Sequence, residues 1–403
     1  MTKESIEKLL AFVREHADED PLKLVFSQHS HPDVDVKLAA QQLEGRRQAL
    51  VKWPTLSACD NYIYPPKLNR EQSSSEETAT FKRLLLNERT NTTDRSFAIA
   101  DLTGGMGIDS VAFAKDNKKY FIDYIEQNPE LCCLMEHNID ALRMDNIGVH
   151  CADSLEWLAK CGKHFDIIYI DPARRDSHGR KVAAFSDCTP NIIDNINLVR
   201  SHCDLLMVKA SPMMDIDSGI SELREVSAVH IVAVKGECKE LLFLCEPHKG
   251  ETEIHCHNIS KNRHYHTSFT RKQENEAEAN YCTKVSGFLY EPDASLMKGG
   301  PFKLLCSLWG LQKLARNTQL YTSNQYKKDF PGRVLQIISE TALNRKAVNA
   351  SIPGGRAHVV TRNYPSEAAT LQKQLGLKEG GELFVVAATV GESKKGFICC
   401  EAK

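Results

Sequence analysis

The amino-acid sequence predicts an α/β protein built around a doubly wound parallel sheet. From about residue 96 to residue 247, short apolar runs alternate with helical segments, which is the pattern of a parallel sheet with helices on both faces. Only residues 235–240 join the last two of seven expected strands. This connection is too short for a crossover helix, so we expect an antiparallel hairpin there. The first strand runs into "TGGMG" at 103–107, and glycines this dense indicate a close approach of the backbone to another group.

Length and composition predict a soluble protein of two or three domains. The chain has 403 residues, of which 42% are hydrophobic and 26% charged, with a net charge of -2. A polycation is therefore excluded, and any nucleic-acid surface must be local. No apolar run approaches the length of a membrane span and the charged N-terminus is not a secretory signal, so we expect no membrane partner and a cytoplasmic protein. The 14 cysteines show no CxxC spacing and are interpreted as reduced thiols.

Changes of pattern along the chain suggest four parts. Apolar residues at helical spacing dominate the N-terminal part, where Ser73 and Glu76 also fit a capping box. Residues 258–282 are polar and charged and are interpreted as a linker. We therefore expect a helical region over 1–94, the main sheet over 95–257, a linker with a small insert over 258–330 and a small α+β module over 331–403.

Each of the first four expected strands ends in or next to a carboxylate. These residues are Asp101, Glu126, Asp153 and Asp171. Open α/β sheets bind ligands at the carboxyl ends of their strands, so we expect the four side chains to surround a ligand. Helix capping is the alternative role for Asp153, which precedes a helical segment, and both roles are compatible.

Two ligands compete for the glycine turn, and a turn without a ligand remains a third possibility. A dinucleotide site requires G-x-G-x-x-G, but Ser110 stands where the third glycine would be. Asp101 would also repel a pyrophosphate. S-adenosylmethionine (SAM) carries an ammonium and a sulfonium group, which a carboxylate at that position compensates. Asp101, Thr103, Gly105 and Gly107 therefore favour SAM over NAD.

The segments "DLTGGMGID", "DYIEQNP", "CADSLEWL" and "IIYIDPARR" resemble the motifs of class I SAM-dependent methyltransferases, which have a seven-stranded Rossmann-like sheet. "EQSSSEETATFK" resembles a segment that lies over the cofactor in related RNA-modifying enzymes. The whole chain is similar to bacterial class I methyltransferases with a ferredoxin-like insert and a C-terminal THUMP-like domain. The resemblance implies SAM as cofactor and these cofactor-binding residues: Gln72, Asp101, Thr103, Gly105, Gly107, Asp109, Glu126, Asp153 and Asp171.

The fourth motif is expected to face the transferable methyl group. Amino-methylating relatives carry D/N-P-P-Y/F/W there, whereas this chain has Asp171, Pro172, Ala173 and Arg174. The acid and the first proline match, and the second proline and the stacking aromatic are missing. We assign Asp171, Pro172 and Arg174 as catalytic and favour a base nitrogen as methyl acceptor. Methylation of pyrimidine carbon five is disfavoured, because it needs a cysteine nucleophile. No cysteine lies in or just after the motifs that end the fourth and fifth expected strands, and the nearest candidate, Cys188, is interpreted as structural.

Structured RNA, either rRNA or tRNA, is the expected partner. Residues 331–403 contain ten Lys or Arg and six Asp or Glu, a local net charge of +4 against -2 for the whole chain. Tyr364 offers a possible stacking group. Arg174 and Arg175 suit phosphate contacts or a guanine edge. Lys209, at the end of the fifth expected strand, could also face the ligand site at the carboxyl ends of the strands. The expected RNA-binding residues are Arg174, Arg175, Arg345, Lys346, Arg356 and Arg362.

Histidines recur at two-residue spacing, at 29 and 31, at 255 and 257, and at 264 and 266. On a strand each pair would share a face. No carboxylate or cysteine set completes a recognisable metal site, so we interpret them as exposed and expect no metal. The favoured function is methylation of RNA. A small-molecule or protein methyltransferase, and a non-catalytic RNA-binding protein on a methyltransferase scaffold, remain alternatives.

Overall fold

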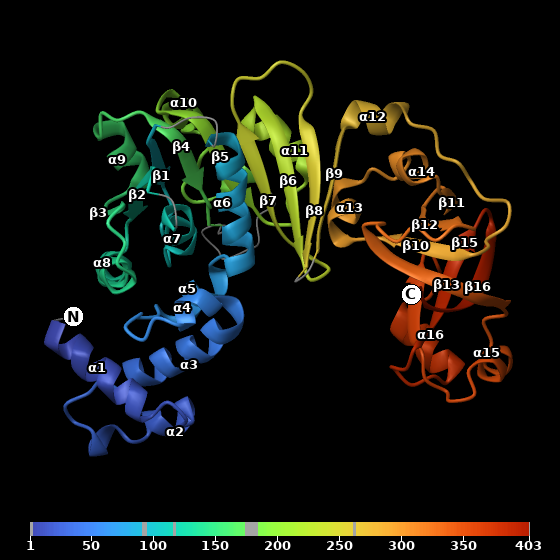
Figure 1. The fold of residues 1–403 in the computed structure, drawn as a ribbon, viewed down its shortest axis with the longest axis horizontal. Coiled ribbons are helices and arrows are strands. Elements are labelled where there is room, and N and C mark those ends of the chain that lie inside the picture. The colour runs from blue at the N-terminus through green and yellow to red at the C-terminus, as the bar shows by residue number, and fades with distance from the viewer. Residues whose placement is uncertain (1–2, 91–94, 116–117, 174–183, 261–262, 403) are drawn as a thin grey trace. The chain divides into compact units, whose positions relative to one another are not determined.

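The structure is a computed structural model that describes residues 3–90, 95–115, 118–173, 184–260 and 263–402 (Figure 1). Contacts divide the chain into two compact units. The first comprises residues 1–227 and 240–248, and the second comprises residues 228–239 and 249–403. Both units combine helices with sheet strands, which confirms the α/β class. Among the described residues, no helix has the length and apolarity needed to cross a membrane.

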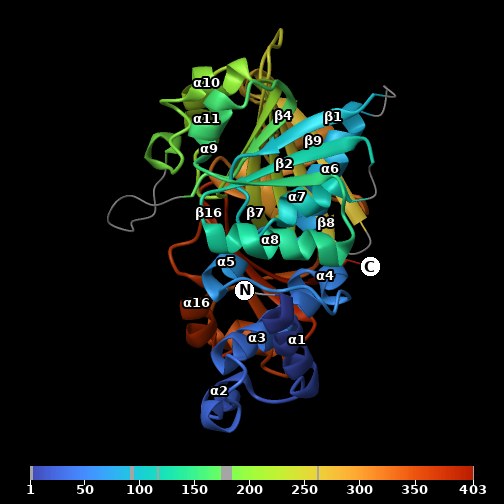
Figure 2. The ribbon, with the colours of Figure 1, turned by 90° about the vertical axis from the view of Figure 1, so that its left-hand side faces the viewer.

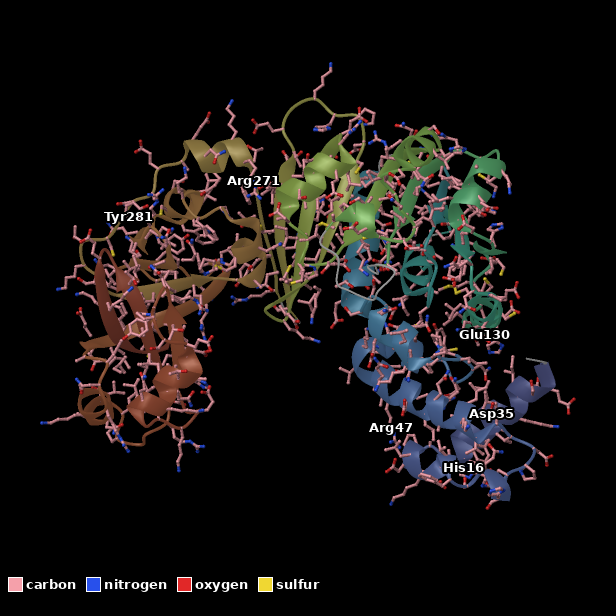
Figure 3. All side chains as sticks on the ribbon, turned by 180° about the vertical axis from the view of Figure 1, so that it is seen from behind. His16, Asp35, Arg47, Glu130, Arg271 and Tyr281 are labelled. Atoms are coloured by element: carbon pink, nitrogen blue, oxygen red, sulfur yellow. The ribbon has the colours of Figure 1, made fainter. Side chains whose placement is uncertain are left out.

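The first unit begins with the expected helical region. Asp35 caps α3 by accepting a hydrogen bond from the Leu38 amide at 3.0 Å, and the His16 ring stacks on Phe12 of α1. Figure 3 labels Asp35 and His16 among these helices. Buried side chains of α1, α2 and α3 form a small core around Val13. The helices are α1 (Lys3–Glu15), α2 (Pro21–Val25), α3 (Val36–Lys52), α4 (Pro54–Ser57), α5 (Lys67–Gln72) and α6 (Glu76–Thr90), with a 3₁₀ turn at Gln28–Ser30.

Six strands of the first unit lie side by side in the order β3-β2-β1-β4-β5-β7. The first five are parallel to their neighbours, and β7 runs antiparallel to β5. The strand order reverses beside β1, and open α/β sheets bind ligands at the carboxyl ends of the strands next to such a reversal. The strands are β1 (Phe97–Asp101), β2 (Tyr120–Glu126), β3 (Ile147–Cys151), β4 (Phe165–Ile170), β5 (Cys203–Ala210) and β7 (Glu237–Cys245).

Helices cover both faces of these strands, as the alternating pattern predicts. Figure 2 shows α6, α7 and α8 on one side and α9, α10 and α11 on the other. The inner residues of β1 and β4 are almost completely buried as a result. The helices after α6 are α7 (Ile108–Ala114), α8 (Pro129–Leu142), α9 (Ser154–Lys160), α10 (Ile196–Ser201) and α11 (Ile216–Leu223), with a 3₁₀ turn at Phe185–Asp187.

The expected count of seven strands is too small. The strand β6 (Val226–Val234) belongs mostly to the second unit, where it is parallel to β8 (Glu253–Ser260), and β8 is antiparallel to β9 (Arg263–Thr270). The segment interpreted as a linker therefore contains a strand, followed by α12 (Arg271–Glu276). The polar composition does not distinguish this strand from a linker, because half of the residues of β9 are exposed and only Phe269 is buried.

A second sheet follows within the second unit. Its seven strands lie in the order β11-β12-β10-β13-β16-β15-β14, and β10 pairs with β13. One face packs around Leu289 and Phe397, and the other packs against α15 and α16 around Val385. The elements are β10 (Phe288–Pro292), α13 (Ala294–Gly299), α14 (Leu304–Trp309), β11 (Gln312–Ala315), β12 (Thr318–Ser323), β13 (Gly332–Thr341), α15 (Arg345–Ser351), β14 (His358–Arg362), α16 (Ala368–Leu375), β15 (Leu383–Val390) and β16 (Ser393–Glu401).

A buried lysine connects α6 to the sheet of the first unit. The Nζ atom of Lys82 lies 2.8 Å and 2.9 Å from the two carboxylate oxygens of Glu240 on β7. The same atom lies 3.1 Å from Asp109 Oδ1 on α7 and donates to Ser74 Oγ at 3.2 Å. Lys82 is completely buried, and Glu240 is 2% exposed. Charges removed from water are tolerated only when partners of this kind surround them.

We expect Lys82→Met to destabilise the first unit by about 3–5 kcal/mol, because it leaves two buried carboxylates without their cation. Hydrogen–deuterium exchange over residues 76–90 measures the effect as faster exchange. The control is Lys67→Met, which removes an exposed ion pair with Glu71 and is expected to cost less than about 1 kcal/mol. Equal exchange in the two variants would contradict a structural role for the buried ammonium group.

Candidate functional site

The glycine turn after β1 has the conformation that its sequence requires. Gly105 and Gly107 have φ angles of 54° and 78°, a region that side chains rarely adopt. A Cβ atom at Gly104 would overlap the Tyr124 ring, and one at Gly107 would lie 2.5 Å from the Met135 sulfur. At Gly105 the added atom would meet only the Thr103 carbonyl oxygen, at 3.6 Å. Gly104 and Gly107 thus allow Tyr124 and Met135 to pack against the turn, and Gly105 leaves space beside it.

Glu126, at the end of β2, holds this turn in place. Its Oε2 atom accepts a hydrogen bond from the Gly105 amide at 2.9 Å, and its Oε1 atom accepts one from the Asn128 amide at 2.8 Å. The Tyr124 hydroxyl donates to the Gly105 carbonyl at 2.7 Å. Each carboxylate oxygen has a second lone pair, so Glu126 can still accept two hydrogen bonds from a ligand.

Asp101 is buried at the end of β1, with an exposed fraction of 1%. It accepts hydrogen bonds from the Thr103 amide at 3.1 Å and from the Ser110 hydroxyl at 2.7 Å. Burial raises the pKa of Asp101 to about 7, and repulsion by Asp109 and Asp171 adds to this shift. The carboxyl group is therefore poised between its neutral and charged forms near neutral pH.

Asp171 follows β4 and forms an ion pair with the cation of β5 that the sequence suggested. Its Oδ2 atom lies 2.5 Å from the Nζ atom of Lys209, and its amide donates to the Thr103 hydroxyl at 2.7 Å. Burial lowers the pKa of Lys209, but attraction by Asp171, Glu240 and Asp109 outweighs burial and holds the pKa above its ordinary value. Lys209 therefore remains charged and keeps Oδ2 engaged, while Oδ1 makes neither of these contacts.

Asp153 acts as the N-cap of α9. Its Oδ1 atom accepts hydrogen bonds from the Leu155 and Glu156 amides, both at 3.0 Å. The Oδ2 atom takes part in neither bond, and the residue is exposed. The capping role is confirmed, and it is compatible with a contact to a ligand.

Asp109 lies in the buried charge network and faces α6. Its Oδ2 atom accepts hydrogen bonds from Ser74 at 2.8 Å and from Tyr169 at 2.9 Å. Burial raises the pKa of Asp109, but Lys82 and Lys209 outweigh burial and hold it below the ordinary value. The segment containing Ser74 is thereby tied to the glycine turn, and Gln72 at the end of α5 is exposed beside it in the sequence.

The remaining residues of the fourth motif are only partly described. Pro172 is buried, and Ala173 forms an isolated bridge with Thr189. Arg174 and Arg175 lie outside the described residues. Cys188 is 5% exposed, and all 14 cysteines are free thiols.

The basic residues of the second unit differ in their surroundings. Arg345, Lys346 and Arg356 are exposed. Arg362 is half-buried and, with Arg333, forms ion pairs with Glu291 on β10, so part of its charge is already compensated. The sequence did not identify Lys394 and Lys395, which line a groove of about 590 Å³ together with Tyr364. The adjacent lysines before the apolar run "GFICC" are the signal that was available.

Family models match two adjacent segments of the second unit. Residues 288–331 match a ferredoxin-like domain, and residues 332–402 match a THUMP domain-like family. The meeting point of the two matches coincides with the start of β13. No curated protein matches the sequence.

One solved structure is similar to the chain over its whole length. It is the crystal structure of a putative methyltransferase from Porphyromonas gingivalis W83, with 27% sequence identity, a TM-score of 0.88 and coverage of 100% of each chain. A structure of human methyltransferase-like protein 13 in complex with SAH has 18% identity and a TM-score of 0.32, and covers 46% of this chain and 83% of that one. A class I S-adenosylmethionine-dependent methyltransferase of Listeria monocytogenes, itself named as putative, has 10% identity and a TM-score of 0.39, and covers 63% of this chain and 93% of its own. The chain therefore has the fold of the Porphyromonas gingivalis protein, and its residues 332–402 are THUMP domain-like.

Proposed function

We propose that the first unit binds SAM at the carboxyl ends of β1 to β4 and transfers its methyl group to a base nitrogen of rRNA or tRNA. The observation that carries the proposal is the placement of Asp101, Glu126, Asp153 and Asp171. Each residue ends or follows one of four adjacent parallel strands, so all four carboxylates lie along one edge of the sheet. Four carboxylates there suit a cationic ligand that also carries hydroxyl and amino groups.

Residues of the turn and of the neighbouring strand ends fit SAM in four ways. The space beside Gly105 accepts a ligand against the backbone. The remaining lone pairs of Glu126 suit the two ribose hydroxyls, and Oδ2 of Asp153 suits the amino group of adenine. Asp101 supplies a negative charge near the ammonium group. When bound, SAM supplies an activated methyl group whose leaving sulfur needs no further activation. Thr103, Gly107, Asp109 and Gln72 then position the turn and the segment beside it.

Asp171 has the role of orienting the nucleophile. Its Oδ2 atom is held by Lys209 at 2.5 Å, so the Oδ1 atom is presented in a fixed direction. A carboxylate oxygen accepts a hydrogen bond from an N–H group of a base and can take its proton after methyl transfer. Pro172 fixes the backbone beside it, and Arg174 and Arg175 are proposed to contact phosphate or a guanine edge.

The second unit is proposed to contribute RNA binding. Arg345, Lys346 and Arg356 are exposed and suit phosphate contacts. Tyr364 and Lys394 combine an aromatic ring and an ammonium group in one groove, which suits an unstacked base and its backbone. Lys395 lines the same groove, and its charge is partly compensated by Glu340 at 2.8 Å. Arg362 acts mainly through its ion pair with Glu291.

We expect Gly105→Val to weaken binding of S-adenosylhomocysteine at least tenfold, or about 1.4 kcal/mol, because the side chain fills the space beside the turn. Isothermal titration calorimetry measures the affinity. Gly391→Val is the control, since Gly391 also has a positive φ angle, 56°, and open space around its Cβ position. Unchanged affinity in Gly105→Val would remove the ligand from this turn.

Binding of S-adenosylhomocysteine is expected to release protons near neutral pH. The pKa of Asp101 is about 7 without ligand, and an ammonium group beside the carboxylate lowers it, so affinity increases as the pH rises from 5.5 to 7. Calorimetry in buffers of different protonation enthalpy measures the released protons. Asp101→Asn keeps the hydrogen-bonding shape and accounts for titration of the ligand itself. The same pH dependence in both proteins would contradict the role of Asp101.

Mass spectrometry of RNA nucleosides from cells with and without the gene tests the complete proposal, with loss of one methylated nucleoside as the expected result. We expect wild type and Asp187→Asn to restore it. Asp187 is an exposed acid of the neighbouring 3₁₀ turn. Asp171→Asn is expected to reduce the methylation rate by about 10²–10⁴-fold, the usual contribution of a positioned proton acceptor.

Two outcomes would redirect the assignment. Transfer of labelled methyl groups only to protein or small molecules in cell extract would favour a different substrate class. Full restoration of the nucleoside by Asp171→Asn would remove that residue from the reaction.

A further inference from the structure

Five histidines from three adjacent strands gather on one face of the sheet in the second unit. His230 of β6 lies opposite His255 of β8, and His257 of β8 lies opposite His266 of β9. Alternate residues of a strand point to the same face, so His255 joins His257, and His264 joins His266. The sequence pattern showed the pairs on β8 and β9, but not the neighbouring His230.

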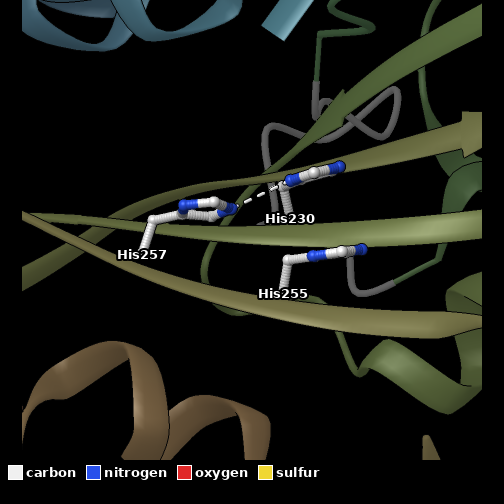
Figure 4. Close-up of side chains that lie close together, drawn as sticks. All are labelled: His230, His255 and His257. Carbon is white, nitrogen blue, oxygen red and sulfur yellow. Dashed lines mark hydrogen bonds between the residues drawn. The ribbon is translucent and has the colours of Figure 1, made fainter. Parts of the chain in front are cut away.

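The imidazole rings are stacked and their nitrogens face one another. His230 Nδ1 lies 3.0 Å from His257 Nε2, and His257 Nδ1 lies 3.1 Å from His264 Nε2. His255 Nδ1 lies 3.0 Å from His266 Nε2. One nitrogen from each of His230, His255 and His257 falls within 4.8 Å of the other two. Figure 4 shows these three rings and the contact between His230 and His257.

Burial decreases from the first strand to the third. His230 and His257 are 5% and 6% exposed, His255 is half-buried, and His264 and His266 are exposed. The expectation that these histidines are all exposed is therefore wrong for His257. The opposite face of the same strands packs against α13, where Gly299 lies close to Cys256 and Ile231. The histidine face is thus a separate, polar surface with an open side at β9.

A neutral imidazole keeps one nitrogen lone pair and can therefore bind a cation. The ring nitrogens of His230, His255 and His257 that lie within 4.8 Å of one another are placed closely enough to share one ion.

We propose that His230, His255 and His257 form a binding site for one divalent transition-metal ion, of which Zn²⁺ is the probe. Neutral imidazole is a preferred ligand of Zn²⁺, Ni²⁺ and Cu²⁺. Three protein ligands with an open fourth position are usual where zinc also binds water or another molecule. Here the exposed side at β9 supplies the entry path, and His266 is the nearest further imidazole, 3.0 Å from His255.

Neighbouring groups fix the ring nitrogens that would face the ion. His264 can accept the Nδ1 proton of His257, which leaves Nε2 of His257 directed at His230. The Glu253 carboxylate lies 3.2 Å from Nε2 of His255 and can accept that proton. Nδ1 of His255 faces Nε2 of His266 at 3.0 Å, so an ion at Nδ1 would replace this contact. Partners of this kind commonly orient metal-bound histidines. In a tetrahedral site with bonds of about 2.0–2.1 Å, two nitrogens lie roughly 3.3 Å apart, close to the separation of His230 and His257.

Zinc titration of the chelator-treated full chain, purified without a polyhistidine tag, tests the site. Calorimetry is expected to show one Zn²⁺ per chain, and Co²⁺ is expected to give the strong visible absorption of a four-coordinate site. His255→Gln changes a half-buried ligand, and His230→Asn changes a buried one. Each is expected to weaken zinc binding at least tenfold, and circular dichroism checks that each variant is folded.

The control is His150→Gln in the first unit. His150 is also half-buried and lies 2.6 Å from a carboxylate oxygen of Asp123, and its loss is expected to leave zinc binding unchanged. The proposal is overturned if folded wild type binds no zinc, or if both folded cluster variants bind it as tightly as wild type. It is also overturned if only a double change of the exposed His264 and His266 to Ala abolishes binding. The histidines would then form a hydrogen-bonded array without a metal, or a superficial site.

Discussion

The ammonium group of Lys82 is the contact on which the arrangement of the first unit depends. Its partners Ser74, Asp109 and Glu240 belong to three separate segments. The carboxylates of Asp109 and Glu240 are buried together with the lysine. Removing any one of these charges would leave its partners buried and uncompensated, which strongly destabilises a folded protein. The helix α6, the turn into α7 and the strand β7 are therefore fixed together. This network joins the N-terminal helical region to the proposed cofactor site and makes it part of that site's framework.

Carboxylates along the same sheet edge are stabilised differently. Asp171 has a cation, Lys209, at 2.5 Å, whereas Asp101 has two hydrogen-bond donors and a pKa of about 7. Glu126 is occupied by backbone amides and shapes the glycine turn. The carboxylate group thus has three different surroundings along this edge. They suit the proposed roles of Asp171 in orienting a reacting group and of Asp101 in responding to the charge of a ligand, whereas Glu126 supports the backbone.

Local patterns predicted the elements of the first unit well, because strand alternation, turn glycines and capping residues act over a few positions. Asp101 to Asp171 could be placed at one edge from the strand–helix order alone. Long-range partners could not be predicted: nothing near Lys82 in the sequence indicates Glu240, and nothing near His257 indicates His230. The strand β9 was missed because its polar, exposed side chains resemble those of a linker. Arg362 was assigned to RNA because Glu291, its partner, is 71 positions away.

The pairing of β10 with β13 joins the two segments that separate family models match. The ferredoxin-like segment ends at residue 331 and the THUMP domain-like segment begins at residue 332, yet these two strands share five residue pairs in one sheet. Division at that boundary would leave two exposed sheet edges, which promote aggregation. The two segments therefore depend on each other for a complete sheet, although each matches a family model of its own.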